Sequence, residues 1–300
     1  MARRRVSVRW RASCKQQHLT LTFARQDPAQ AMCPGLFHPM PRGRRGAMDI
    51  RYRHGDVAAR VMGVQLGAPD LAVLLAVLAH CGVARAGVPA APQGDLGLVL
   101  RRELKPRGAA EEAASAACRV GYRELARAAG MADGGRNREQ MLDSLRRLMT
   151  VTVFQKSRDG VEWGSHILSF AADHATQKLV ITVNHGATEA LTGLRPTAYV
   201  SLPEHHALRG DTAKVLHHYL SAWIGPGHRQ AVGLAALVRR VWPDPAPNPR
   251  TERKRRHLVR EALRELTTLP GWRITEPRGG MYAIRRSRVL PEKSSHANNT

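Results

Sequence analysis

The sequence predicts an α+β protein in which one order of elements occurs twice: a helix, a short second helix, a longer third helix and a β-hairpin. Apolar residues recur at helical spacing in several segments, and alternating apolar residues indicate short strands between turn-forming residues. Glycine- and proline-rich stretches separate these segments. With 300 residues, the chain is long enough for two compact domains.

The first copy begins with a nearly all-apolar segment, residues 70–81, which predicts a helix at the centre of a core. Residues 88–117 are rich in proline, glycine and alanine, and the only element that they suggest is a strand over residues 96–100. Tyr122, Leu125, Ala126 and Ala129 share one face of a short helix, and Gly130 suits its C-cap.

A glycine turn then leads to the longer helix of this first copy, predicted over residues 136–149. Residues 151–154 and 163–170 flank a turn and predict a hairpin, and residues 178–183 alternate as a further strand. Short helix, glycine turn and second helix together are typical of a helix-turn-helix.

The second copy starts with a predicted helix over residues 211–224, ended by Gly225-Pro226-Gly227. A short helix follows over residues 232–241. The linker over residues 243–249 contains four prolines and cannot be helical.

The most informative segment, residues 250–286, follows that linker. Basic residues recur at spacings of three and four, which places them on one helix face: Arg250, Arg253, His257, Arg260 and Arg264. Apolar residues form a stripe on the opposite face: Val259, Ala262, Leu263 and Leu266. Residues 271–276 and 281–286 then flank Pro277-Arg278-Gly279-Gly280 and predict a basic hairpin.

A helix with one apolar and one arginine face, followed by a basic hairpin, indicates the recognition helix and wing of a winged-helix module. We therefore expect tandem winged-helix domains, the first over residues 20–190 and the second over residues 191–289. Residues 1–19 predict a basic, disordered extension, and residues 290–300 a polar tail.

The charge of the chain points to a polyanionic partner. Lys and Arg number 47 against 24 Asp and Glu, a formal net charge of +23. Codon bias in a GC-rich genome accounts for much of the arginine content. Arginine forks also pair bidentately with guanine and phosphate, so both explanations hold together.

Double-stranded DNA is the expected partner, and the second copy should supply most contacts. Its helix is predicted to reach bases and phosphates through Arg250, Arg253, Lys254, Arg255, Arg256, His257, Arg260 and Arg264, with Arg255 nearer the apolar side. Its hairpin is predicted to reach the DNA backbone through Arg273, Arg278, Arg285 and Arg286.

The first copy is expected to contact DNA more lightly or to support self-association, because Glu139 and Asp143 on the exposed face of its helix repel phosphates. Its candidate contacts are Arg136, Asn137, Gln140 and Arg147 on the helix and Lys156 and Arg158 on the hairpin.

The sequence predicts no catalytic, cofactor or metal site. No Gly-Lys dipeptide occurs, so a phosphate-binding loop of the helicase type is absent. No two histidines are separated by one residue, which argues against a metal-dependent nicking tyrosine. The doublets His205-His206 and His217-His218 point about 100° apart on a helix, so they indicate packing or solvated side chains instead of a bidentate site.

The expected location is the bacterial cytoplasm. The four cysteines form no C-x-x-C pair, as is typical of free thiols in a cytosolic protein. The longest apolar run, residues 71–79, is much shorter than the roughly 20 residues that a membrane span requires.

The chain resembles the C-type replication initiators (RepC) of broad-host-range IncQ-like plasmids over residues 20–288. In the N-terminal half, the matching residues are Asp27-Pro28-Ala29, Pro34-Gly35-Leu36-Phe37, Gly55-Asp56, Tyr122-Arg123 and Leu125-Ala126. In the C-terminal half, they are Asp211-Thr212-Ala213, Leu216-His217, Trp223-Ile224, Pro226-Gly227, Val241-Trp242-Pro243, residues 253–256, residues 259–263, Gly271-Trp272 and Tyr282. The basic extension and residues 88–117 lie outside the resemblance or match it poorly.

The resemblance implies a protein that binds direct repeats (iterons) in a plasmid origin and opens the duplex beside them. It also implies a helicase and a primase supplied as separate proteins, and control by a monomer–homodimer equilibrium. A winged-helix transcriptional regulator without melting activity is the alternative. Iterons beside an AT-rich segment, with helicase and primase genes adjacent, would distinguish the initiator.

Overall fold

The structure is a computed structural model that describes residues 21–40, 45–173, 176 and 178–288. The basic extension and the polar tail expected from the sequence lie outside the described residues. The helices are α1 (Pro28–Ala31), α2 (Ala68–Ala84), α3 (Asp95–Leu104), α4 (Ala109–Glu112), α5 (Tyr122–Ala128), α6 (Gly135–Thr150), α7 (His185–Thr192), α8 (Leu202–Ala207), α9 (Asp211–Trp223), α10 (Leu234–Val241) and α11 (Pro249–Thr267).

The strands form four sheets, and every pair of named strands is antiparallel. Their bounds are β1 (Phe23–Gln26), β2 (Ala47–His54), β3 (Val57–Val64), β4 (Ala86–Val88), β5 (Arg107–Gly108), β6 (Ser115–Gly121), β7 (Thr152–Lys156), β8 (Glu162–His166), β9 (Leu168–Asp173), β10 (Lys178–Val183), β11 (Ala198–Ser201), β12 (Arg229–Gly233), β13 (Trp272–Arg278) and β14 (Met281–Arg286). The sheet orders are β1-β11, β4-β6-β10-β9, β12-β14-β13 and β2-β3-β7-β8-β5. The fold class is α+β, as the sequence predicts.

One arrangement of three helices and three strands occurs twice. The first copy runs α2, β6, α5, α6, β9, β10, and the second runs α9, β12, α10, α11, β13, β14. The sheet orders β6-β10-β9 and β12-β14-β13 are equivalent, because in both the last strand lies between the other two. The repeated element order therefore extends to the pairing of the strands.

Two insertions distinguish the first copy. Between α2 and β6 the chain adds β4, α3, β5 and α4, and between α6 and β9 it adds the β7–β8 hairpin. The segment 163–170, expected to be one strand, is divided at Ile167 between β8 and β9, which belong to different sheets. The strand pair that corresponds to β13–β14 is thus β9–β10, and not the hairpin expected over residues 151–170.

The strand expected over residues 96–100 is wrong: this segment lies in helix α3. Leu100 and Leu104 are buried one turn apart, and the buried Arg101 side chain donates to the carbonyl oxygens of Ala110, Glu111 and Ala113. The alternation of leucines over residues 96–100 fits a strand as well as a helix, and these later contacts favour the helix.

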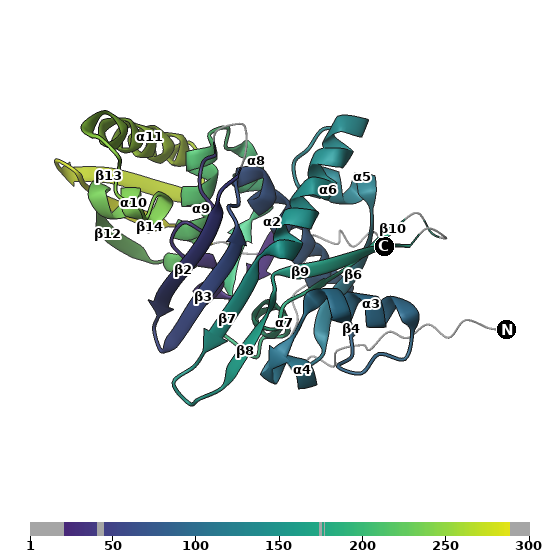
Figure 1. The fold of residues 1–300 in the computed structure, drawn as a ribbon. Coiled ribbons are helices and arrows are strands. Elements are labelled where there is room, and N and C mark those ends of the chain that lie inside the picture. The colour runs from purple at the N-terminus through teal and green to yellow at the C-terminus, as the bar shows by residue number, and fades with distance from the viewer. Residues whose placement is uncertain (1–20, 41–44, 174–175, 177, 289–300) are drawn as a thin grey trace, which may run out of the picture.

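Helix α2 is central, as its composition predicts. Its residues from Leu71 to Ala79 are all buried, so it packs on every side. Helix α6 packs against α2, α2 against α9, and α9 against α11. The two repeats therefore share one hydrophobic core, and in Figure 1 α11 lies at the left and α6 to the right of the centre.

Candidate DNA-binding surface

Helix α11 is built as the sequence predicts. The Asn248 side chain caps it by accepting a hydrogen bond from the Thr251 backbone N–H at 2.8 Å, and Pro249 occupies the first turn. Its buried residues are Val259, Ala262, Leu263 and Leu266, which face α9 and α10. Packing of this stripe leaves the opposite side of the helix to solvent.

The exposed side of α11 carries the basic residues expected there: Arg250, Arg253, Lys254, Arg256, His257, Arg260 and Arg264. Two of them have carboxylate partners on the same helix. Arg256 lies 2.8 Å from Glu252, and Arg264 pairs with Glu261. Within the described residues, no ion pair is found for Arg250, Arg253 or Lys254, so their charges are free for a ligand.

Arg255 lies closer to the protein than its neighbours, as expected. Its guanidinium donates to the Asp244 carbonyl oxygen at 2.7 Å and lies 5.6 Å from the centre of the Trp242 ring. These contacts fasten the start of α11 to the preceding linker. Arg255 is therefore an anchor of the helix, and any phosphate contact that it makes must be lateral.

The β13–β14 hairpin presents alternate residues to two faces. Tyr282, Ile284 and Trp272 are buried, whereas Arg273, Arg278 and Arg285 are exposed. Burial raises the pKa of the Tyr282 phenol, and the nearby Arg260 side chain opposes that rise. Arg260 thus connects the exposed side of α11 to the hairpin.

The expectation that Arg286 contacts DNA is wrong, because this side chain is fully buried. It donates to the carbonyl oxygens of Ser221 at 2.8 Å, Ile224 at 3.3 Å and Tyr199 at 2.7 Å. It also lies over the Trp272 ring, and burial lowers the pKa of its guanidinium. Arg286 therefore holds β14 against the end of α9 and against β11.

In the first repeat, α6 presents less free positive charge than its sequence suggests. Arg147 is not available as expected: it lies 2.8 Å from the buried Asp70 carboxylate, which also pairs with Arg45 at 2.5 Å. Arg146 pairs with Asp143 at 2.7 Å, and Arg138 lies over the Tyr122 ring at 4.0 Å. Asp70 is 77 residues from Arg147 in the chain, so no local pattern could reveal this pair.

The other candidates of α6 lie near its start. Arg136 and Gln140 are exposed, and Asn137 donates to the Ala132 carbonyl oxygen at 2.7 Å, within the turn before the helix. The exposed face of α6 is therefore only weakly basic.

Lys156 and Arg158 are exposed, but they lie on the β7–β8 hairpin of the five-stranded sheet. Lys156 is 3.4 Å from Glu162, and Arg158 is 3.8 Å from Asp56 at the tip of the β2–β3 hairpin. The structure thus does not bring them beside the strand pair that corresponds to β13–β14.

One functional candidate was missed. Arg229 begins β12 and is exposed, directly opposite Arg285. A helix was expected over residues 232–241 and no strand before it, whereas residues 229–233 form a strand. The turn residues Gly225-Pro226-Gly227 just before it were the available signal for a strand.

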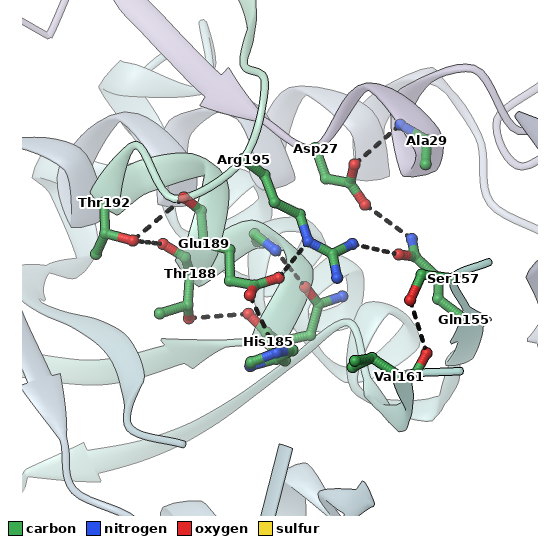
Figure 2. Close-up of polar contacts among 12 residues, drawn as sticks. Asp27, Ala29, Gln155, Ser157, Val161, His185, Thr188, Glu189, Thr192 and Arg195 are labelled. Atoms are coloured by element: carbon green, nitrogen blue, oxygen red, sulfur yellow. Dashed lines mark hydrogen bonds and ion pairs between the residues drawn. The ribbon is translucent and has the colours of Figure 1, made fainter. Parts of the chain in front are cut away.

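The segment that begins Asp27-Pro28-Ala29 has a structural role. Figure 2 shows Asp27 accepting hydrogen bonds from the Ala29 N–H at 2.9 Å and from the Gln155 amide at 2.7 Å. Gln155 in turn accepts from Arg195, which pairs with Glu189 at 2.5 Å. This network ties α1 and β7 to α7 in the interior of the protein.

The histidine doublets mostly pack in the interior. His205, His217 and His218 are buried, and His206 is exposed. His217 lies 2.9 Å from Glu204, and His218 lies 3.0 Å from Gln26. Burial lowers the pKa of His218 to about 3, so its ring is neutral at physiological pH. Over the part of the chain that the structure describes, no three His, Cys, Asp or Glu side chains are grouped as a metal site.

Among the described helices, none is both long and apolar enough to cross a bilayer.

Comparison with known proteins gives one family. The family model for replication protein C (RepC) matches residues 18–288, nearly the whole chain. No curated protein sequence matches significantly. Among solved structures, domains 2 and 3 of RctB are similar at a TM-score of 0.46 and 14% identity, over 88% of this chain and 97% of that one. A second structure of RctB domains 2–3 is similar at a TM-score of 0.44 and 13% identity, over 83% of this chain and 95% of that one.

Proposed function

The chain belongs to the replication protein C (RepC) family of replication initiators, and from this premise we propose that it binds repeated sequences (iterons) in duplex DNA at a plasmid origin. The observation that carries the proposal is helix α11: its buried stripe fixes it on the protein, and its exposed side offers arginines without carboxylate partners. Such a helix suits insertion into the major groove, where an arginine fork can pair with guanine.

We further propose that each repeat is a winged-helix module, with α11 and α6 as third helices and β13–β14 and β9–β10 as wings. The order of elements and the equivalent strand pairing support this assignment. Arg250, Arg253, Lys254, His257 and Arg260 then face bases and flanking phosphates, and Arg278 at the tip of the wing approaches the backbone. The first repeat contributes fewer contacts, because Arg138, Arg146 and Arg147 on α6 have partners within the protein.

Duplex opening follows in this proposal from binding several copies to repeats in phase. If the array fits bent or unwound DNA better than straight DNA, strain concentrates in flexible AT-rich steps. The chain then needs no nucleotide hydrolysis of its own and acts as a binding protein, not an enzyme. Helicase and primase come from separate proteins, and a homodimer links or silences origins.

The test of the α11 assignment is binding of duplex DNA that carries the repeats of the protein's own replicon, against scrambled DNA, at physiological salt. Wild-type protein should prefer the repeats by about 10³ or more. The double substitution Arg253→Ala with Arg260→Ala should cost on the order of 1–3 kcal/mol for each base contact removed. The matched control replaces two exposed arginines on β2, Arg51 and Arg53, by Ala and should keep the preference.

If the double variant binds the repeats as tightly as the wild type, the assignment of α11 is wrong. Permanganate reactivity of thymines beside the repeats then separates the two functions. Reactivity that depends on the protein supports an initiator. Tight repeat binding without reactivity at any protein concentration supports the transcriptional regulator.

A further inference from the structure

The outer face of the β12-β14-β13 sheet carries three arginines in one row. Arg229 pairs with Arg285 in the register of β12 and β14, and Arg273 pairs with Arg285 in the register of β13 and β14. Residues directly opposite each other in antiparallel strands project to the same face, with Cβ atoms about 5 Å apart. All three side chains are exposed. We call this set the arginine row.

The arginine row faces away from the layer that contains α11. Tyr282, Ile284 and Trp272 project to the inner face of the sheet, where they are buried in the shared core. Helix α11 contacts β13 from that side, and Arg260 lies beside Tyr282. Because successive residues of a strand alternate, Arg285 and its two neighbours point in the opposite direction.

Among the described residues, none of the three members of the arginine row has an ion pair with an acid. The neighbouring outer-face row is small and neutral: Ala231, Ala283 and Thr275. The nearest acid in the sheet, Glu276, accepts from the Gly280 N–H and lies near Tyr282. Like charges directly opposite each other on a sheet destabilise it, so the row costs folding free energy in the absence of a ligand.

We propose that the arginine row binds the phosphate backbone of duplex DNA outside the segment that α11 holds. Guanidinium groups pair bidentately with phosphate, and the small neutral row beside them lets a backbone approach closely. The outer face has no aromatic residue, so it offers no stacking platform for the bases of a single strand. This inference deepens the proposed function and rests on it. One chain binds DNA on two of its faces, and it thereby bends one duplex or bridges two.

The first measurement is the salt dependence of binding to a random-sequence duplex of about 40 base pairs. The row variant replaces Arg229, Arg273 and Arg285 by Gln, and the control variant replaces Arg51, Arg53 and Arg85 by Gln, which are exposed and have no ion pair among the described residues. Each phosphate contact adds about 0.9 to the slope of log K against log salt, so the row variant should lose about 2–3 units and the control almost none. Equal slopes for the wild type and the row variant overturn the proposal.

The second measurement distinguishes this proposal from the assignment of α11. Titration with a duplex of about one helical turn, roughly 10–12 base pairs, should give two duplexes per wild-type chain. The row variant and the Arg253→Ala, Arg260→Ala variant should each bind one. If the α11 variant still binds two duplexes and the row variant binds one, α11 is wrongly assigned and the arginine row is supported as a DNA-binding site. If the row variant still binds two duplexes, or the wild type binds only one, the arginine row is not a separate DNA-binding site.

A DNA-free readout separates binding from a structural role. The single substitution Arg285→Gln removes the central charge of the row and should raise Tm at about 0.01 M salt, where the screening length is about 30 Å. At about 1 M salt, where that length is about 3 Å, the gain should disappear. A lower Tm at both salt concentrations means that the arginines hold the sheet together, and it contradicts the proposal.

Discussion

At the scale of single residues, Arg285 and Arg286 show how one position decides the role of a side chain. Both were expected to contact DNA. The pleat of β14 places Arg285 outside and Arg286 inside, on the same face as the buried Tyr282 and Ile284. The alternation from Tyr282 onward would have placed Arg286 inside from the sequence alone. Its carbonyl partners at Tyr199, Ser221 and Ile224 are too distant in sequence to be predicted.

We expect Arg286→Gln to lower the free energy of unfolding by about 3 kcal/mol, because it leaves buried carbonyl oxygens without a donor. The matched control is Arg285→Gln, one residue away and exposed, which should change it by less than about 0.5 kcal/mol at physiological salt. Urea unfolding followed by tryptophan fluorescence measures both. Equal losses in the two variants would show that the buried hydrogen bonds of Arg286 add nothing to stability.

At the scale of elements, the sequence predicts best those helices and strands whose ends carry capping or turn-forming residues. Helix α11 has Asn248 and Pro249 at its start and an uninterrupted buried stripe; it was expected from Arg250 and begins at Pro249, the last residue of the segment expected to be a linker. The division of residues 163–170 at Ile167 has no such marker. It depends on which sheet each half joins: β8 pairs with β7 and with the distant β5, whereas β9 pairs with β10 in another sheet. Helix α3 was missed because its decisive contacts lie beyond the five residues that suggested a strand.

The cap of α11 gives an element-scale prediction. Asn248→Ala removes the acceptor for the Thr251 N–H and should lower the free energy of unfolding by about 1 kcal/mol. Because the first turn carries Arg250 and Arg253, its fraying should also weaken binding to the repeats. Asn248→Ser keeps a capping oxygen and serves as the control, with stability and affinity close to wild type. If the Ala and Ser variants bind DNA equally well, the first turn is not part of the DNA-binding surface.

At the scale of the whole molecule, the sequence predicts two repeats but not how closely they are joined. Their shared core follows from contacts of α2 with α9, and α2 is buried on all sides because it serves both repeats. A second junction lies where the Pro34-Gly35-Leu36-Phe37 loop meets the linker before α11. There the Gly35 N–H donates to the Arg240 carbonyl oxygen at 3.3 Å. The segment before the first repeat therefore contacts the end of α10 and the linker that leads to α11.

Gly35 makes this junction testable. Its φ is +71°, and a Cβ added to it would lie 2.6 Å from Pro243 Cγ and 2.7 Å from Cδ. Gly35→Ala should therefore combine backbone strain with a clash against the linker and cost about 2–4 kcal/mol of unfolding free energy. Gly193→Ala is the matched control, because its φ is +78° and no atom lies within 4 Å of the added Cβ. It should cost about 1–2 kcal/mol from the backbone alone.

The same pair of variants tests whether this junction affects α11. At a temperature where both remain folded, Gly35→Ala should weaken binding to the repeats, since displacing Pro243 shifts the linker that Arg255 fastens to the helix. Gly193→Ala, at the C-cap of α7, should bind like the wild type. If both variants lose stability equally and bind alike, the contact of Gly35 with Pro243 is incidental.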